Sequence, residues 1–168
     1  MVYPPLLLDR LQAAAASPWQ GRAFRHMFAD YPPDAENTRG ARWNPAEVAA
    51  VYTSLTRDGV IAEANHQIAL QPLPPRVKRT VYEIDIALTS VVDLTGSEAL
   101  VSLDLASDDI AGDDMTACQQ IGGAAAWLGR DGVLVPSARS DAVNLVIFAA
   151  NREPDTRFDV LASEPLDS

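Results

Sequence analysis

The sequence predicts a single α+β domain built around a mixed β-sheet. Segments that alternate apolar and polar residues, or that are continuously apolar, outnumber the segments with helical periodicity. The two kinds of segment do not alternate strictly along the chain, which favours an α+β domain. With 168 residues, 48% of them apolar, the chain can bury one real core, so we expect one domain over residues 1–168 and no linker.

The chain is expected to begin with a short helix at residues 6–16. Leu7, Leu8 and Leu11 share one face of this helix, and two prolines stand just before it as start signals. We therefore expect residues 1–20 to form an N-terminal helical flap.

Three strands and one helix are expected in the next part of the chain. Residues 23–28 alternate apolar and polar positions, and residues 49–54 are rich in β-forming side chains. Residues 56–70 change to helical periodicity and are followed by three prolines, which end the helix. Residues 79–88 then alternate cleanly, which predicts another strand.

The second half of the chain starts with a broken, acidic stretch. We expect a short helix or turns at residues 97–103 and a loop at residues 107–114. Residues 115–128 are expected to be helical although Gly122 and Gly123 each cost about 1 kcal/mol relative to alanine. Three strands are expected to complete the sheet, at residues 131–139, 142–150 and 156–163.

The net charge of the chain restricts its partners. A formal charge of −10 repels nucleic-acid phosphates and anionic lipids over most of the surface, so we expect no direct contact with nucleic acid or membrane. A small anionic ligand remains possible where a few arginines gather in one cleft, because a local field can exceed the net field at short range.

Cysteine usage and the N-terminus both favour the cytoplasm. Cys118 is the only cysteine, which excludes an internal disulfide and a cysteine-based zinc site. The N-terminus lacks a basic region, and no stretch approaches the roughly 20 apolar residues that a membrane helix needs. We expect the protein to stay where it is made.

The spacing of the polar residues alone gives little indication of a catalytic or metal site. Glu63 and Arg25 are compatible with solvated positions, whereas Ser137 follows an apolar strand and a proline, a position from which side chains often reach a pocket. His26 and His66 lack acidic partners at triad or metal-site spacing, so we expect no metal. The nucleophile-elbow motif G-x-S-x-G and the glycine-rich phosphate-binding loops are absent from the sequence.

Two blocks of sequence carry a specific resemblance. The run GARWNPAEVAAVYTSLTRDGVIAE at residues 40–63, followed by DGVLVPSARSDAVNLVIF at residues 131–148, resembles the RES-domain family of bacterial toxins. The resemblance extends from about Phe24 to Phe148. It implies an ADP-ribosyltransferase-like fold with a split mixed sheet. One departure is His26, where many relatives have tyrosine.

The resemblance also implies an NAD⁺ pocket, with NAD⁺ as substrate. The matching positions are Arg25, Arg42, Tyr52, Glu63 and Ser137. Glu63 would stabilise the oxocarbenium-like centre formed when nicotinamide leaves, and Arg25 and Arg42 would hold the pyrophosphate. Tyr52 would stack on nicotinamide, and Ser137 would hold a ribose or phosphate oxygen. The catalytic candidates are Glu63, Arg25 and Ser137.

Three functions remain open at this point. The first is a toxin that cleaves the nicotinamide–ribose bond and passes ADP-ribose to water, phosphate or a target, which depletes NAD⁺. The second is a protein ADP-ribosyltransferase that modifies one specific host enzyme, and the third is a non-catalytic nucleotide-binding module, which would be expected to lose Glu63 or an arginine. The resemblance further implies a cognate antitoxin with a helix-turn-helix, Xre-like DNA-binding domain.

Overall fold

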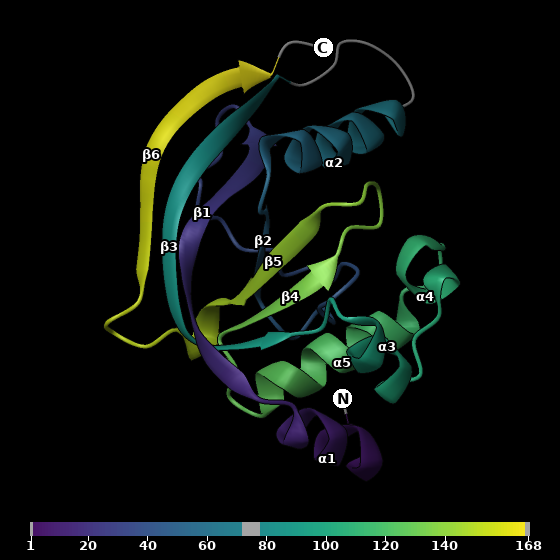
Figure 1. Cartoon of the computed structure of the whole chain (residues 1–168). Helices are drawn as coiled ribbons and strands as arrows, with labels where there is room; N and C mark the ends of the chain where they lie inside the picture. Colours follow the sequence, from purple (N-terminus) through teal and green to yellow (C-terminus); the bar gives the residue numbers. More distant parts are fainter. Residues whose placement is uncertain (1, 72–77, 167–168) are drawn as a thin grey trace.

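The computed structural model describes residues 2–71 and 78–166, and these residues form one α+β domain (Figure 1). In chain order the elements are α1 (Pro5–Ala13), β1 (Ala16–Phe28), β2 (Ala50–Ser54), α2 (Arg57–Ala69), β3 (Arg79–Asp93), α3 (Ser97–Ser102), α4 (Ser107–Ala111), α5 (Thr116–Trp127), β4 (Gly132–Pro136), β5 (Val143–Phe148), the 3₁₀ turn η1 (Ala149–Asn151) and β6 (Arg157–Leu166).

The described strands form one mixed sheet that curls back on itself. Their order is β1-β2-β5-β4-β3-β6, and β1 also pairs with β3. Strands β3 and β4 run parallel, whereas the other pairs are antiparallel. Strands β1 and β2 meet only at Phe24 and Ser54, so the sheet divides there into a curved β1-β3-β6 layer and a β2-β5-β4 layer (Figure 1). The predicted mixed sheet is confirmed.

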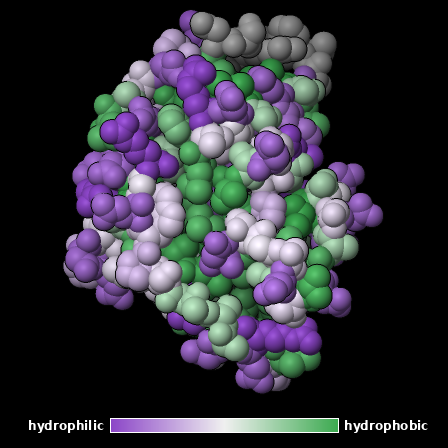
Figure 2. All heavy atoms as spheres, in the orientation of Figure 1, coloured by the Kyte–Doolittle hydropathy of each residue, from purple (hydrophilic) through white to green (hydrophobic). Residues whose placement is uncertain are grey.

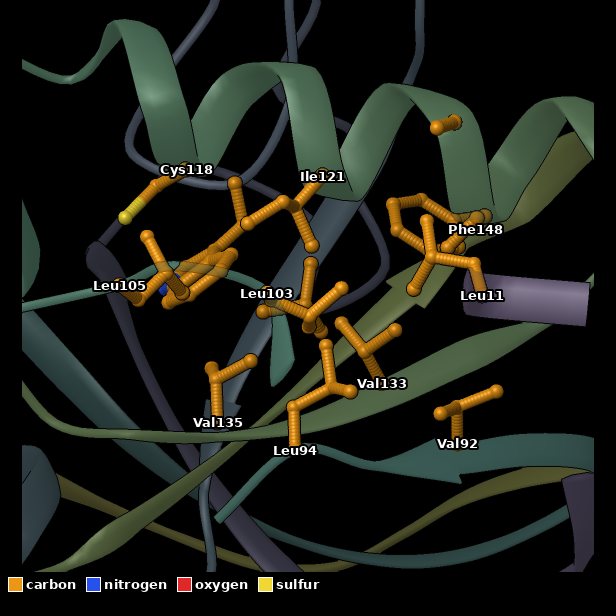
Figure 3. Close-up of a cluster of buried hydrophobic side chains, with 14 of the residues drawn as sticks. Leu11, Val92, Leu94, Leu103, Leu105, Cys118, Ile121, Val133, Val135 and Phe148 are labelled. Carbon is orange, nitrogen blue, oxygen red and sulfur yellow. The ribbon is translucent and has the colours of Figure 1, made fainter. Parts of the chain in front are cut away.

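Two apolar clusters hold these layers together. One lies between the two parts of the sheet and includes Ile84 and Ile86 from β3 and Leu145 and Ile147 from β5. The other lies between β4, β5 and α5, and Figure 3 shows its side chains beneath that helix. Figure 2 shows hydrophilic side chains along the margins of one face and apolar side chains toward its middle.

The N-terminal segment differs from the expected helical flap at residues 1–20. The helix covers only Pro5–Ala13, and the chain enters β1 at Ala16, which pairs with Val92 of β3. Backbone pairing to a long neighbouring strand therefore overrides the helical propensity of the alanine run. The helix packs firmly, since Leu11 is buried in the cluster around α5.

Two further segments differ from the sequence-based expectation. The loop expected at residues 107–114 contains the short helix α4, whose first turn is closed by the Asp109 carboxylate accepting from the backbone N–H of Ala106. Strand β3 continues beyond 79–88 to Asp93, because its last residues pair with β4. Sequence analysis missed this helix because its 5 residues are too few for helical periodicity to be detected.

Helix α5 uses its two glycines for close packing. A Cβ at Gly122 would overlap the backbone carbonyl of Trp43, and a Cβ at Gly123 would overlap the Tyr3 phenol. The glycines that weaken the helix locally are thus required by its neighbours. Within residues 2–71 and 78–166, no helix has the length and apolar character needed to cross a membrane.

Candidate active site

A cavity of about 560 Å³ opens where β1 and β2 separate, beside α2 and the loop that follows β1. Its volume is in the range of small-molecule and cofactor sites. Five arginines line it against two glutamates: Arg25, Arg39, Arg42, Arg79 and Arg139, with Glu36 and Glu63. A chain with a net charge of −10 therefore gathers positive charge in this one cavity, which favours an anionic ligand.

Glu63 reaches the cavity wall from α2. The helix begins at Thr56, whose hydroxyl accepts from the backbone N–H of Gly59 at 3.0 Å. Glu63 Oε1 accepts hydrogen bonds from Ser137 Oγ at 2.6 Å and from Asn144 Nδ2 at 3.2 Å. The carboxylate is half-buried and held in place, unlike a freely solvated helix glutamate.

Ser137 is hydrogen-bonded to Glu63 in this structure. The residue is 8% exposed and is not among those that line the cavity. Its hydroxyl donates to Glu63 and accepts from the backbone N–H of Arg139 at 3.1 Å. This geometry orients the carboxylate, whereas the sequence-based expectation was a direct contact with substrate.

Arg25 lies on β1 with its guanidinium buried at the cavity. The residue is 7% exposed, and Nη1 donates to the carbonyl of Pro33 at 2.7 Å. Burial lowers the pKa of Arg25 to about 10, and the Asp34 carboxylate opposes that shift. Arg25 stays cationic at neutral pH and can attract an anion.

Arg42 lines the cavity, but its terminal nitrogens are already engaged. Nη1 donates to the carbonyl of Asp109 at 3.1 Å and Nη2 to the carbonyl of Gly112 at 2.7 Å. Arg42 thus secures the segment around α4 through two of its backbone carbonyls.

The Tyr52 hydroxyl is engaged in the same way. It donates to Asn44 Oδ1 at 2.5 Å and accepts from the backbone N–H of Trp43 at 2.9 Å. Burial raises the pKa of Tyr52, so the phenol stays protonated. Tyr52 thus fixes the turn that carries Arg42, and it is one of the residues that line the cavity.

Sequence reasoning missed three polar residues of the cavity. Asn144 supports Glu63, and its own Oδ1 is buried without a hydrogen-bond partner in the part of the chain that the structure describes. Arg79 and His26 contact each other at one side of the cavity. Asn144 could have been noticed as the amide that interrupts the apolar run AVNLVIF, and Arg79 as the cation that opens a strand. The partnership between Arg79 and His26 had no sequence signal.

The described residues contain no group of three or more His, Cys, Asp or Glu side chains that could hold a metal ion. The chemistry that this site can perform with its own groups is electrostatic: a fixed carboxylate beside a set of arginines.

Comparison with known proteins identifies the family. The RES domain profile matches residues 8–167. The NAD(+) phosphorylase MbcT of Mycobacterium tuberculosis and that of Mycobacterium bovis are each 32% identical over 153 residues, which covers 85% of this chain and 80% of theirs. The crystal structure of the M. tuberculosis MbcT–MbcA toxin–antitoxin complex superposes with a TM-score of 0.85 at 26% identity, covering 97% of this chain and 93% of the other. The ADP-ribosyltransferase-like fold expected from the sequence is confirmed by this match. The chain belongs to the RES domain family.

Proposed function

We propose that this protein is the toxin of a toxin–antitoxin pair and depletes NAD⁺ by phosphorolysis. The observation that carries the proposal is the Glu63 carboxylate, fixed by Ser137 and Asn144 at the wall of an arginine-lined cavity. The names of the MbcT relatives supply the reaction class, and the sequence match includes both blocks that hold these residues.

The proposed reaction needs only one carboxylate. A phosphate oxygen attacks the anomeric carbon of the nicotinamide-bearing ribose, and the bond from that carbon to the ring nitrogen breaks. The bonding electron pair returns to the ring nitrogen, so nicotinamide leaves neutral and requires no general acid, unlike an alcohol leaving from an ordinary glycoside. Glu63 stabilises the positive charge that develops on the ribose, and ADP-ribose 1-phosphate is the second product.

The arginines serve the anionic parts of the substrates. Arg25 is the best candidate to bind the pyrophosphate. Its guanidinium is buried at the cavity, and of its nitrogens only Nη1 has a hydrogen-bond partner among the described residues. Arg42 contributes its charge, but both of its terminal nitrogens already bind backbone carbonyls. We assign Arg42 mainly to the support of the cavity wall, with Tyr52 contributing a ring surface against nicotinamide.

A partner follows from the same relationship. The MbcT structure was solved as a complex with the antitoxin MbcA, and an enzyme that drains NAD⁺ requires a means of restraint in its own cell. We propose that a cognate antitoxin with a helix-turn-helix DNA-binding domain covers the cavity in the bacterial cytoplasm. The acidic surface of this chain agrees with the antitoxin making the DNA contacts.

The test uses protein freed of any partner and incubated with NAD⁺, with and without inorganic phosphate and with a cell lysate. Free nicotinamide and ADP-ribose 1-phosphate are followed by chromatography and mass spectrometry, and adenosine-tagged NAD⁺ reports any labelled protein. We expect phosphate-dependent nicotinamide release that Glu63→Gln abolishes, with no labelled band. Release without phosphate dependence would indicate water as acceptor, one labelled band would indicate a protein ADP-ribosyltransferase, and no release would leave a binding module.

A matched control variant distinguishes the loss of one negative charge from the loss of the proposed catalytic carboxylate of Glu63. Glu164→Gln removes a carboxylate that pairs with Arg57 on the surface, at 2.6 Å and away from the cavity. We expect this variant to retain the activity of the unmodified protein.

A further inference from the structure

Arg79, His26 and Gln67 form a polar cluster that the proposed roles leave unused. Arg79 opens β3, His26 lies near the end of β1, and Gln67 lies on α2. Arg79 Nη1 lies 3.2 Å from His26 Nδ1 and donates to Gln67 Oε1 at 3.3 Å. All three residues line the cavity, at the end of β1 and β3 that lies beside α2 in Figure 1.

Arg79 carries a buried charge without a carboxylate partner. The residue is 6% exposed, and its guanidinium lies over the Phe28 ring at 4.6 Å from the ring centroid. Its Nε is buried and has no hydrogen-bond partner within residues 2–71 and 78–166. Among the described residues no carboxylate lies within ion-pair distance of it, and burial is the cause that lowers its pKa. An unpaired buried cation is costly, and an anion in the cavity would offset that cost.

His26 adds a neutral donor whose tautomer is set by Arg79. A guanidinium can only donate, so His26 Nδ1 accepts and the ring proton lies on Nε2. Burial, with Arg79 and Arg25 nearby, lowers the pKa of His26 to about 4, so the ring stays neutral at pH 7. The ring therefore offers an N–H group at the cavity without adding a second charge.

The cluster lies close to the proposed catalytic carboxylate. Gln67 follows Glu63 by four residues on α2, and both side chains line the cavity. Residues four apart on a helix share a face and are separated by about 6 Å. An anion held by Arg79 would thus share the cavity with the Glu63 carboxylate and lie beside the helix face that carries it.

We propose that Arg79, His26 and Gln67 form a subsite for a phosphate-type oxyanion, occupied by the inorganic phosphate that attacks NAD⁺. The identity of this occupant rests on the phosphorolysis proposed above. The pyrophosphate of NAD⁺ has the same chemistry and is the other source of such a group. Arg79 binds the oxyanion through its guanidinium, His26 donates from Nε2, and Gln67 holds the guanidinium in place.

The experiment measures binding separately from turnover, so that failure of the subsite and failure of phosphorolysis can be distinguished. Dissociation constants for inorganic phosphate alone and for NAD⁺ alone are measured by calorimetry for the unmodified protein and for Arg79→Gln. The Michaelis constants for both substrates are measured alongside. The matched control is Arg57→Gln, which removes the same charge from an exposed arginine that pairs with Glu164 outside the cavity.

We expect Arg79→Gln to weaken phosphate binding and to raise the KM for phosphate by about tenfold or more, while NAD⁺ affinity changes less than about twofold. A tenfold loss of NAD⁺ affinity with phosphate binding unchanged would retain the oxyanion subsite and assign it to the pyrophosphate. The proposal would be overturned if Arg79→Gln and Arg57→Gln had the same affinity for phosphate and the same affinity for NAD⁺.

A second measurement uses the unmodified protein and so does not depend on whether Arg79→Gln folds. In protein labelled with ¹⁵N-histidine, titration with inorganic phosphate should shift the Nε2 resonance of His26, which is assigned by its loss in His26→Gln. A His26 resonance that moves with neither phosphate nor NAD⁺ would overturn the subsite. A shift with phosphate in a protein that releases no nicotinamide would support the subsite while the proposed phosphorolysis fails.

Discussion

Ser137 Oγ donates a hydrogen bond to Glu63 Oε1 across 2.6 Å, which joins the loop after β4 to the middle of α2. The two residues are 74 positions apart in the chain. Because Ser137 also accepts from the backbone N–H of Arg139, its hydroxyl hydrogen is directed at the carboxylate. Ser137, which does not line the cavity, therefore orients the Glu63 carboxylate, which does.

This relationship predicts the kinetic effect of Ser137→Ala. Loss of a hydrogen bond to a charged group costs about 1.5–3 kcal/mol, so we expect kcat to fall by about 10- to 100-fold while the KM for NAD⁺ changes little. Steady-state kinetics of nicotinamide release provide the measurement. Ser140→Ala is the control, since among the described residues the Ser140 hydroxyl accepts from the backbone N–H of Ala142 in the same loop and makes no hydrogen bond with Glu63. A rise in KM with kcat unchanged would return Ser137 to a substrate-binding role.

Arg42→Lys separates a structural role from a phosphate-binding role. Lysine keeps the charge but cannot bridge the carbonyls of Asp109 and Gly112 as the guanidinium does. We expect a loss of about 1–2 kcal/mol in stability and faster hydrogen exchange over residues 107–114, both larger than in the exposed control Arg39→Lys. If Arg42→Lys leaves hydrogen exchange over residues 107–114 unchanged but greatly weakens NAD⁺ binding, then Arg42 binds the pyrophosphate instead.

Gly122→Ala tests the packing of α5 on the loop that carries Arg42. Helix propensity alone predicts a gain of about 1 kcal/mol, but the added Cβ would overlap the carbonyl of Trp43. We expect a net loss of about 2–4 kcal/mol in urea unfolding. Gly96→Ala is the control, because a Cβ there would have no atom of the described residues within 4 Å. Any stabilisation by Gly122→Ala would disprove the close approach.

Stability should fall with acidification through the titration of His26. The pKa of this ring is lowered from 6.5 to about 4 in the folded state, chiefly by burial. Between these values the unfolded chain binds the proton and the folded chain does not, so stability present above pH 6.5 is lost as pH falls toward 4. The contribution is at most about 3 kcal/mol. Urea unfolding from pH 4.5 to 7.5 should show a shallower loss in His26→Gln, and parallel curves would refute this assignment.

Much of the fold could be predicted from the sequence because its signals are local. Alternation and apolar runs located most strands, and the helices expected at 56–70 and 115–128 match α2 and α5 to within two residues. The start of β1 and the helix α4 were missed. The first depends on pairing with β3, and the second is a single turn closed by one aspartate.

The residue types of the candidate site were available from the sequence. The two blocks at residues 40–63 and 131–148 carry Arg42, Tyr52, Glu63 and Ser137, and Arg25 precedes them within the wider resemblance. What each side chain contacts was decided only by the tertiary structure. Arg42 binds carbonyls near α4, Ser137 binds Glu63, and Arg79 meets His26 across paired strands. The physical reason is that hydrogen-bond partners distant in sequence leave no periodic trace in the chain. Only the packing of α2, the divided sheet and the α4 segment determines which donor faces which acceptor.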